Sequence, residues 1–232
     1  MGAVADAAAH VFVADLDDLV LGDADAHHLG RVLRLRVGER VTVSDGMGGL
    51  RLCHVTAGGG RIRVEAAGDV ERHPRPEPAV TIGFALTKGE KPEWAVQRLT
   101  EVGVDRIVPF VAARSVVRWD APRAARQTER LRAVARAAAM QSRRVWLPEV
   151  GPPRPFADLV SEMSGSAALA DPGGSSPTLA RPAIFVGPEG GFDDAERGTG
   201  LPRVRLADHV LRAETAAVTA GILLCALRGG LL

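Results

Sequence analysis

The sequence predicts an α/β protein in which a small β-barrel domain precedes a larger domain built on a mainly parallel sheet. Three observations support this fold class: strand-like segments with glycine turns early in the chain, a proline-rich break after them, and strands alternating with helices beyond it. A chain of 232 residues is long enough for two modest domains. We therefore expect a first domain over residues 1–73 and a second over residues 79–232.

The first part of the chain has the pattern of short strands joined by tight turns. Apolar and polar residues partly alternate over residues 40–45, 50–55 and 61–65. Glycine-rich segments at residues 45–49 and 58–60 separate these strands, and glycine supplies the positive φ angles that hairpins need. One short helix is expected from about residue 25 to residue 35. This pattern favours a small barrel.

The segment His73-Pro-Arg-Pro-Glu-Pro78 is predicted to be the domain boundary, because three alternating prolines cannot continue a helix or a central strand. Beyond it, strands are expected at residues 80–86, 106–111, 183–186 and 203–206, and helices at residues 92–102, 122–141 and 213–228. Residues 171–177 are expected to form a loose loop. The alternation predicts a mainly parallel sheet, whose ligands usually bind at the carboxyl ends of the strands.

The composition excludes little: the formal net charge is +1 and the hydrophobic fraction is 46%. Lys88 and Lys91 are the only lysines, so nearly all the positive charge is arginine. Two explanations stay open, codon bias in a GC-rich genome and the recognition of phosphates by a planar fork of donors.

Cys53 and Cys225 cannot form a disulfide framework, and no histidine pair has metal-ligand spacing. The N-terminus lacks the pattern of a signal peptide, and the longest apolar stretch, residues 216–227, is too short to cross a bilayer. We expect a cytoplasmic protein with no membrane segment and no metal.

The most informative segment is residues 184–196, in which a buried strand leads through Gly187-Pro-Glu-Gly-Gly191 into a helix. Glycines allow backbone amides to approach a ligand, and Asp193 with Glu196 has the spacing of a capping box. The alternative is a structural strand-to-helix turn. The motifs of dinucleotide sites and P-loops are absent from the sequence.

A second segment, residues 206–216, repeats the order of strand, loop and helix. Amides at the start of its helix could accept an anion, although Glu214 could simply complement the helix dipole. The helix is apolar almost all round, so we expect it to be buried in a core or an interface.

Two further segments carry cations. Lys88 and Lys91 follow a predicted strand end and could contact phosphates or form a solvated turn. Arg143 and Arg144 follow the long predicted helix, where they would also favour the helix dipole.

Taken in order, these four segments resemble the RsmE family of ribosomal RNA uracil-N3 methyltransferases, within the SPOUT superfamily. The resemblance also includes His27-His-Leu-Gly-Arg-Val-Leu-Arg34 and so covers nearly the whole chain. Met140 stands where the family usually has Glu, and Ala207 where it commonly has Gly.

The resemblance implies a PUA-like β-barrel that binds RNA, a SPOUT domain with a trefoil knot near its C-terminus, and a homodimer. It also implies S-adenosylmethionine as the cofactor and rRNA of the small ribosomal subunit, 16S rRNA, as the partner. The residues expected to bind the cofactor are Leu86, Thr87, Gly187, Pro188, Glu189, Gly190, Gly191, Leu206, Val210, Leu211, Arg212, Thr215 and Ala216.

Methylation of uracil N3 requires loss of its proton and stabilisation of charge on the flanking carbonyls. Glu189 and Glu214 are the candidate bases, with water as an alternative, and Arg144 and Arg212 are the candidate charge stabilisers. The residues expected to bind RNA are Arg31, Arg34, Arg36, Lys88, Lys91, Arg114, Arg118 and Arg143.

The chain contains no Asn, which SPOUT ribose methyltransferases generally have near the start of the domain. This absence favours a base as the target. Three alternatives stay open: a SPOUT enzyme acting on another RNA, a non-catalytic RNA-binding homologue, and an enzyme of phosphate ligands that uses Gly187–Gly191 as an anion nest.

Overall fold

A computed structural model describes residues 6–58 and 61–232. The chain divides into two compact units, residues 1–75 with 139–147, and residues 76–138 with 148–232. Residues 139–147, which the sequence boundary assigns to the second domain, thus group with the first. The predicted glycine turn at residues 58–60 and the N-terminal pattern fall partly on residues 59–60 and 1–5, which lie outside the described residues.

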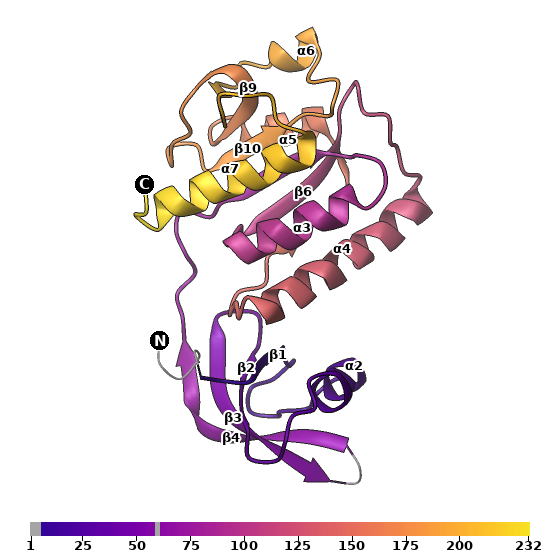
Figure 1. Ribbon diagram of the computed structural model, residues 1–232. Coiled ribbons are helices and arrows are strands. Elements are labelled where there is room, and N and C mark those ends of the chain that lie inside the picture. Colours follow the sequence, from indigo (N-terminus) through magenta and orange to yellow (C-terminus); the bar gives the residue numbers. More distant parts are fainter. Residues whose placement is uncertain (1–5, 59–60) are drawn as a thin grey trace. The chain divides into compact units, whose positions relative to one another are not determined.

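The first unit contains a four-stranded sheet in the order β1-β2-β3-β4 (Figure 1). Its strands are β1 (Ala9–Phe12), β2 (Arg40–Ser44), β3 (Gly49–Gly58) and β4 (Arg61–Arg72). β1 runs parallel to β2, and the other neighbours are antiparallel. The three strands expected here are confirmed, while β1 was not predicted.

The expected short helix is present but changes its hydrogen bonding midway. α2 (Asp23–His27) continues directly into a π-helical turn, η1 (His28–Val32). The amide of Leu33 donates to the carbonyl oxygen of His28 at 2.9 Å, which spans five residues. Leu29 on this turn is buried in the core of the first unit.

Residues 139–147 group with the first unit because they form hydrogen bonds with residues far away in the sequence. The amide of Gly48 donates to the carbonyl oxygen of Val145 at 3.0 Å. His10 is buried between Thr42 Oγ1, 2.9 Å from its Nδ1, and the carbonyl oxygen of Arg144, 3.1 Å from its Nε2. Burial lowers the pKa of His10 to about 4.

The second unit contains a sheet in the order β11-β9-β10-β5-β6-β7, with β8 also pairing with β6. Its strands are β5 (Thr81–Ala85), β6 (Arg106–Val111), β7 (Glu149–Val150), β8 (Arg154–Pro155), β9 (Ala167–Ser175), β10 (Ala183–Val186) and β11 (Arg203–Val204). Every pairing is parallel, as predicted. The predicted loop at residues 171–177 is wrong in its first part, because β9 extends to Ser175.

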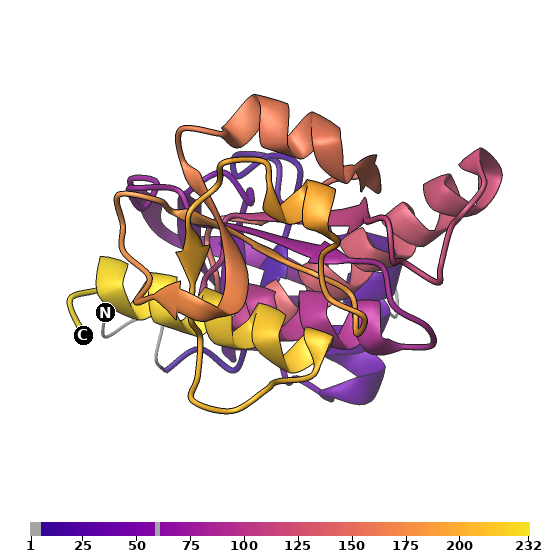
Figure 2. The ribbon, with the colours of Figure 1, turned by 90° about the horizontal axis from the view of Figure 1, so that it is seen from above.

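The helices of the second unit are α3 (Lys91–Val102), α4 (Ala121–Gln141), α5 (Phe156–Met163), α6 (Asp194–Arg197) and α7 (Ala213–Arg228). Figure 2 shows α5 on one side of the sheet and α3 and α7 on the other. β10 is buried on both faces: Ile184 packs with the α3 and α7 side, and Phe185 with the α5 side. Gly83 on β5 leaves room for the Phe185 ring, which a Cβ would overlap.

Candidate functional site

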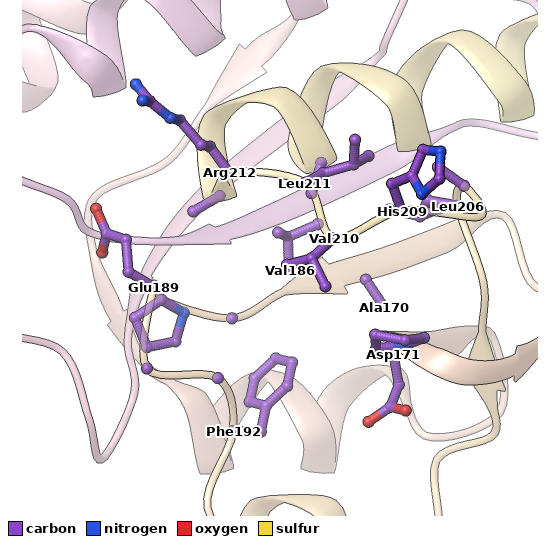
Figure 3. Close-up of a pocket in the computed structure, with 18 of the residues that line it drawn as sticks. Ala170, Asp171, Val186, Glu189, Phe192, Leu206, His209, Val210, Leu211 and Arg212 are labelled. Atoms are coloured by element: carbon purple, nitrogen blue, oxygen red, sulfur yellow. The ribbon is translucent and has the colours of Figure 1, made fainter.

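The two loops singled out in the sequence line a single cavity of about 510 Å³ in the second unit (Figure 3). Pro188 comes from the loop after β10, and Leu211 from the loop between β11 and α7. We call this the loop cavity. Its lining residues are Ala170, Asp171, Pro172, Val186, Gly187, Pro188, Glu189, Gly190, Gly191, Phe192, Arg197, Leu206, Ala207, His209, Val210, Leu211, Arg212, Ala213 and Ala216.

The glycine loop turns sharply after β10 and then starts α6. Gly191 has a φ of +68°, which favours glycine, and its amide donates to the carbonyl oxygen of Pro188 at 2.8 Å. Asp193 Oδ1 accepts from the amide of Glu196 at 2.8 Å, and Glu196 Oε2 accepts from the amide of Asp193 at 3.0 Å. The predicted capping box is confirmed.

The segment after β6 supports this loop from outside the cavity. Arg114 Nη1 donates to the carbonyl oxygen of Gly190 at 2.9 Å. Glu196 Oε1 accepts from the amide of Ala113 at 2.7 Å. Arg114 was predicted to bind RNA; in the structure its guanidinium is already bound to the glycine loop.

The second loop leaves the start of α7 open. Arg212 occupies the N-cap position, and its side chain forms no capping hydrogen bond. The first amides of α7 are therefore available to an acceptor from outside the helix. Val210 is 88% exposed, an unusual position for a large apolar side chain that lines a cavity.

The part of the cavity wall that β9 forms was not predicted from the sequence. Ala170, Asp171 and Pro172 belong to β9, the strand whose end had been assigned to a loop. Asp171 Oδ2 lies 3.7 Å from Arg197 Nη2 in an ion pair. The buried run at residues 167–169 could have signalled a strand, and a carboxylate at its end could have signalled a site.

Phe192 is a second missed lining residue. Its ring lies 5.0 Å from that of Phe156 and 6.2 Å from that of Phe110, so it is held in the core on the α5 side of the sheet. The glycine loop is therefore anchored by an apolar side chain as well as by hydrogen bonds.

Three predicted cofactor residues lie elsewhere. Among the described residues, the lining of the loop cavity does not include Leu86, Thr87 or Thr215. Leu86 and Thr87 are buried after β5, and Thr215 lines a different cavity described below. Their assignment to the cofactor stays a prediction that follows from the resemblance.

The two candidate bases share one cation. Lys91 Nζ lies 2.8 Å from Glu189 Oε1 and 3.5 Å from Glu214 Oε2. The hydrogen bond between Lys91 and Glu189 raises the pKa of the lysine and lowers the pKa of the glutamate. Lys91 was predicted to contact RNA; in this structure it joins α3 to the glycine loop and to the first turn of α7.

The remaining predicted cations divide between the two units. Arg31, Arg34 and Arg36 are exposed in the first unit. Arg143 Nη2 in the same unit donates to the carbonyl oxygen of Ala7 at 2.6 Å. Arg144 also groups with the first unit. In the second unit, Lys88 and Arg118 are exposed.

No group of three or more potential metal ligands occurs among residues 6–58 and 61–232. Within the same described part of the chain, no helix is both long and apolar enough to span a bilayer.

Comparison with known proteins assigns both parts of the chain. Residues 74–224 match the model of an RNA methyltransferase domain, and residues 21–66 match an RNA methyltransferase PUA domain. Ribosomal RNA small subunit methyltransferase E of Mycobacterium bovis is 36% identical over 222 residues, covering 87% of this chain and 83% of that protein. The Synechocystis protein of the same name is 31% identical and covers 87% of this chain and 71% of its own length.

A solved structure is similar over almost the whole chain. It is a Legionella pneumophila protein, described as a methyltransferase and solved with bound SAM. Its sequence is 27% identical, its TM-score is 0.80, and the match covers 94% of this chain and 96% of that one.

Proposed function

This chain belongs to the RNA methyltransferase family that includes ribosomal RNA small subunit methyltransferase E, and from this premise we propose that it methylates N3 of a uridine in 16S ribosomal RNA. S-adenosylmethionine is the proposed methyl donor. One observation of this structure supports the proposal above all: the loop after β10 and the loop before α7 line the same cavity.

The loop cavity fits this cofactor in size and chemistry. Its volume of about 510 Å³ lies within the range of small-molecule sites. Val186, Leu206 and Leu211 offer apolar walls to an adenosine, while Gly187, Gly190 and Gly191 expose backbone. A Cβ on Gly187 would lie 3.2 Å from the Phe192 ring, so the turn packs closely against this ring and leaves little room for a side chain at position 187. When bound, the sulfonium cofactor supplies an electrophilic methyl group.

The residues of the chain then have two tasks, to accept the N3 proton and to stabilise charge on the uracil carbonyls. Glu189 and Glu214 are the proposed acceptors. Arg212 is a proposed charge stabiliser because it lines the cavity and is exposed, with no ion pair found among the described residues. We propose the same role for Arg144, on the resemblance alone.

RNA binding is assigned to the exposed arginines. Arg31, Arg34 and Arg36 are clustered in sequence on the PUA domain, and Arg118 and Lys88 are exposed on the methyltransferase domain. Such side chains would contact phosphates without reading sequence. A ribosomal RNA substrate places the proposed enzyme in the cytoplasm.

The homodimer and the trefoil knot stay proposals that follow from the resemblance. Exposed apolar residues on and after α7 support a dimer. Ile222 on this largely apolar helix is 47% exposed. Leu231 and Leu232, which follow this helix, are 81% and 70% exposed. Light scattering should give twice the monomer mass of 24.4 kDa.

The test of the proposed function is methylation of ribosomal RNA in a strain that lacks the gene. Mass mapping of its 16S rRNA should show one uridine without its N3 methyl group, and the purified protein with S-adenosylmethionine should restore it. An unchanged rRNA pattern with active protein would favour another RNA substrate. Failure to bind S-adenosylmethionine in calorimetry would favour a non-catalytic homologue.

A further inference from the structure

A second cavity of about 610 Å³ lies in the same unit, between α3, α4 and the start of α7. We call it the Trp94 cavity. Its lining residues are Glu90, Lys91, Glu93, Trp94, Gln97, Arg130, Val134, Arg212, Glu214 and Thr215.

The two cavities meet at Arg212, which lines both of them. In Figure 3 the Arg212 side chain points away from the other labelled residues of the loop cavity. Transfer of a methyl group requires the accepting atom to lie about 3–3.5 Å from the donor. A substrate base must therefore occupy space next to the loop cavity, and the Trp94 cavity is such a space.

The Trp94 cavity has groups that suit a nucleobase. Trp94 is 41% exposed, although it is a large apolar residue on a helix that packs into the core, and the guanidinium carbon of Arg98 lies 5.9 Å from the centroid of its ring. An exposed aromatic ring is a platform on which a base can stack. Gln97 lies on the same helix face, three residues later, and its amide can both donate and accept.

Glu214 distinguishes this cavity further. Its side chain is only 14% exposed, and its buried Oε2 has one long contact, the ion pair with Lys91, and no shorter hydrogen bond among the described residues. The nearest cation, Lys91 Nζ, lies 3.5 Å away and is closer to Glu189. A buried acceptor that has only one long contact is poorly satisfied, and the N3–H group of uracil is a donor that would pair with this carboxylate.

Glu189 is placed less well for this task. It lines the loop cavity but not the Trp94 cavity, and its side chain is 51% exposed. Its Oε1 already accepts from Lys91 at 2.8 Å. Figure 3 shows its carboxylate directed away from the cavity interior.

We propose that the Trp94 cavity receives the target uracil, which stacks on Trp94 and gives its N3 proton to Glu214. In this step the N3–H bond breaks and the proton passes to the carboxylate of Glu214. The electron pair left on N3 would form the new bond to the methyl carbon as the bond between that carbon and the sulfur of the donor breaks, and the neutral thioether would leave with that bond's electron pair. The inference rests on the proposed function, since it assumes that the loop cavity holds the methyl donor.

The test measures binding of oligouridylate and oligocytidylate to the full-length protein saturated with S-adenosylhomocysteine. Cytosine has an unprotonated N3 that accepts, so the Glu214 carboxylate should disfavour it by about tenfold. Trp94→Ala should weaken binding of both oligonucleotides by about tenfold, and Trp94→Phe should restore most of it. Glu214→Gln should abolish the preference for uridine, because an amide can pair with either base.

The control is Glu129→Gln, at an exposed glutamate that pairs with Arg132 outside both cavities. It should leave both affinities and the preference unchanged. If Trp94→Ala and Glu214→Gln bind both oligonucleotides as the wild type does, with normal S-adenosylhomocysteine affinity, this proposal is overturned and the proposed function survives. If the wild type does not bind S-adenosylhomocysteine, both are overturned.

Discussion

Pro188 and Leu211 line the same cavity, although α6 and β11 separate them in the sequence. The cavity therefore depends on two loops being held against each other rather than on one motif. The glycine loop is fixed by Arg114, by the capping box of α6 and by the buried Phe192 ring. The second loop is fixed where α7 begins, through buried Ala213 and Ala217. Substitutions on either loop should affect the same ligand.

Gly190→Val should weaken S-adenosylhomocysteine binding by about a hundredfold or more, because a branched side chain between Arg114 and the glycine loop would displace the loop that lines the cavity. A Cβ at this position meets only the Arg114 side chain, at 3.6 Å, so the fold should persist. Calorimetry gives the affinity, and circular dichroism checks the fold. Gly165→Val is the matched control, since a Cβ there meets nothing within 4 Å. Normal affinity in Gly190→Val would remove this loop from the site.

Arg212→Ala should lower kcat by about a hundredfold, the typical effect of losing a group that stabilises developing charge. The affinity for S-adenosylhomocysteine should change by less than about threefold, because the Arg212 side chain points away from the other labelled lining residues in Figure 3. Steady-state kinetics and calorimetry separate the two effects. Arg205→Ala, at an exposed arginine paired with Asp208 at 3.2 Å, serves as the control. A loss confined to cofactor affinity would contradict the assigned role.

Arg114→Ala distinguishes support of the glycine loop from RNA binding. Loss of the 2.9 Å hydrogen bond to Gly190 should weaken cofactor binding by about tenfold and leave RNA affinity nearly unchanged. Arg118 is exposed and lies four residues later in the sequence; Arg118→Ala should weaken RNA binding and leave cofactor affinity nearly unchanged. Filter binding at several salt concentrations, together with calorimetry, gives both affinities. If Arg114→Ala mainly weakens RNA binding, the loop-support role is wrong.

His10 should make the first unit less stable at acidic pH. Its pKa is about 4 in the folded protein against 6.5 for an ordinary histidine, so the unfolded chain binds the extra proton first as the pH falls. The free energy of unfolding should be unaffected above pH 6.5 and should fall by about 3 kcal/mol between pH 6.5 and pH 4.

Urea unfolding of the first unit, followed across this pH range, checks the effect. The matched variant His10→Gln has no titrating ring, so its stability should lack this component of the pH dependence. An identical pH dependence in both proteins would exclude His10 as the cause.

The elements that the sequence predicts well are those that local rules determine. β10 is a short apolar run, and the capping box of Asp193 and Glu196 defines the start of the next helix from four residues alone. The loop cavity was predictable because both of its main loops follow strand ends in a parallel sheet.

The features that were missed depend on contacts between distant segments. Gly173, Gly174 and Ser175 have the composition of a loop, yet they belong to β9. Gly174 is needed there because a Cβ would overlap the backbone of Arg203 on β11. Asp171 was not predicted to line the site because it lies in this same segment, which was expected to be a loop.

Two further features could not be predicted from the sequence: the placement of residues 139–147 and the ion pairs of Lys91. The former depends on the Gly48–Val145 hydrogen bond, and the latter on two glutamates that are remote in sequence. No periodicity encodes either contact. The local pattern around Lys88 and Lys91 left two interpretations open, a phosphate contact and a solvated turn, and neither includes an ion pair with these glutamates.

The most direct test of the central claim is a crystal structure of the protein with S-adenosylhomocysteine. The account predicts the ligand in the loop cavity, in contact with Pro188 on one side and Leu211 on the other. Ligand density elsewhere on the chain, with these two loops unliganded, would contradict it.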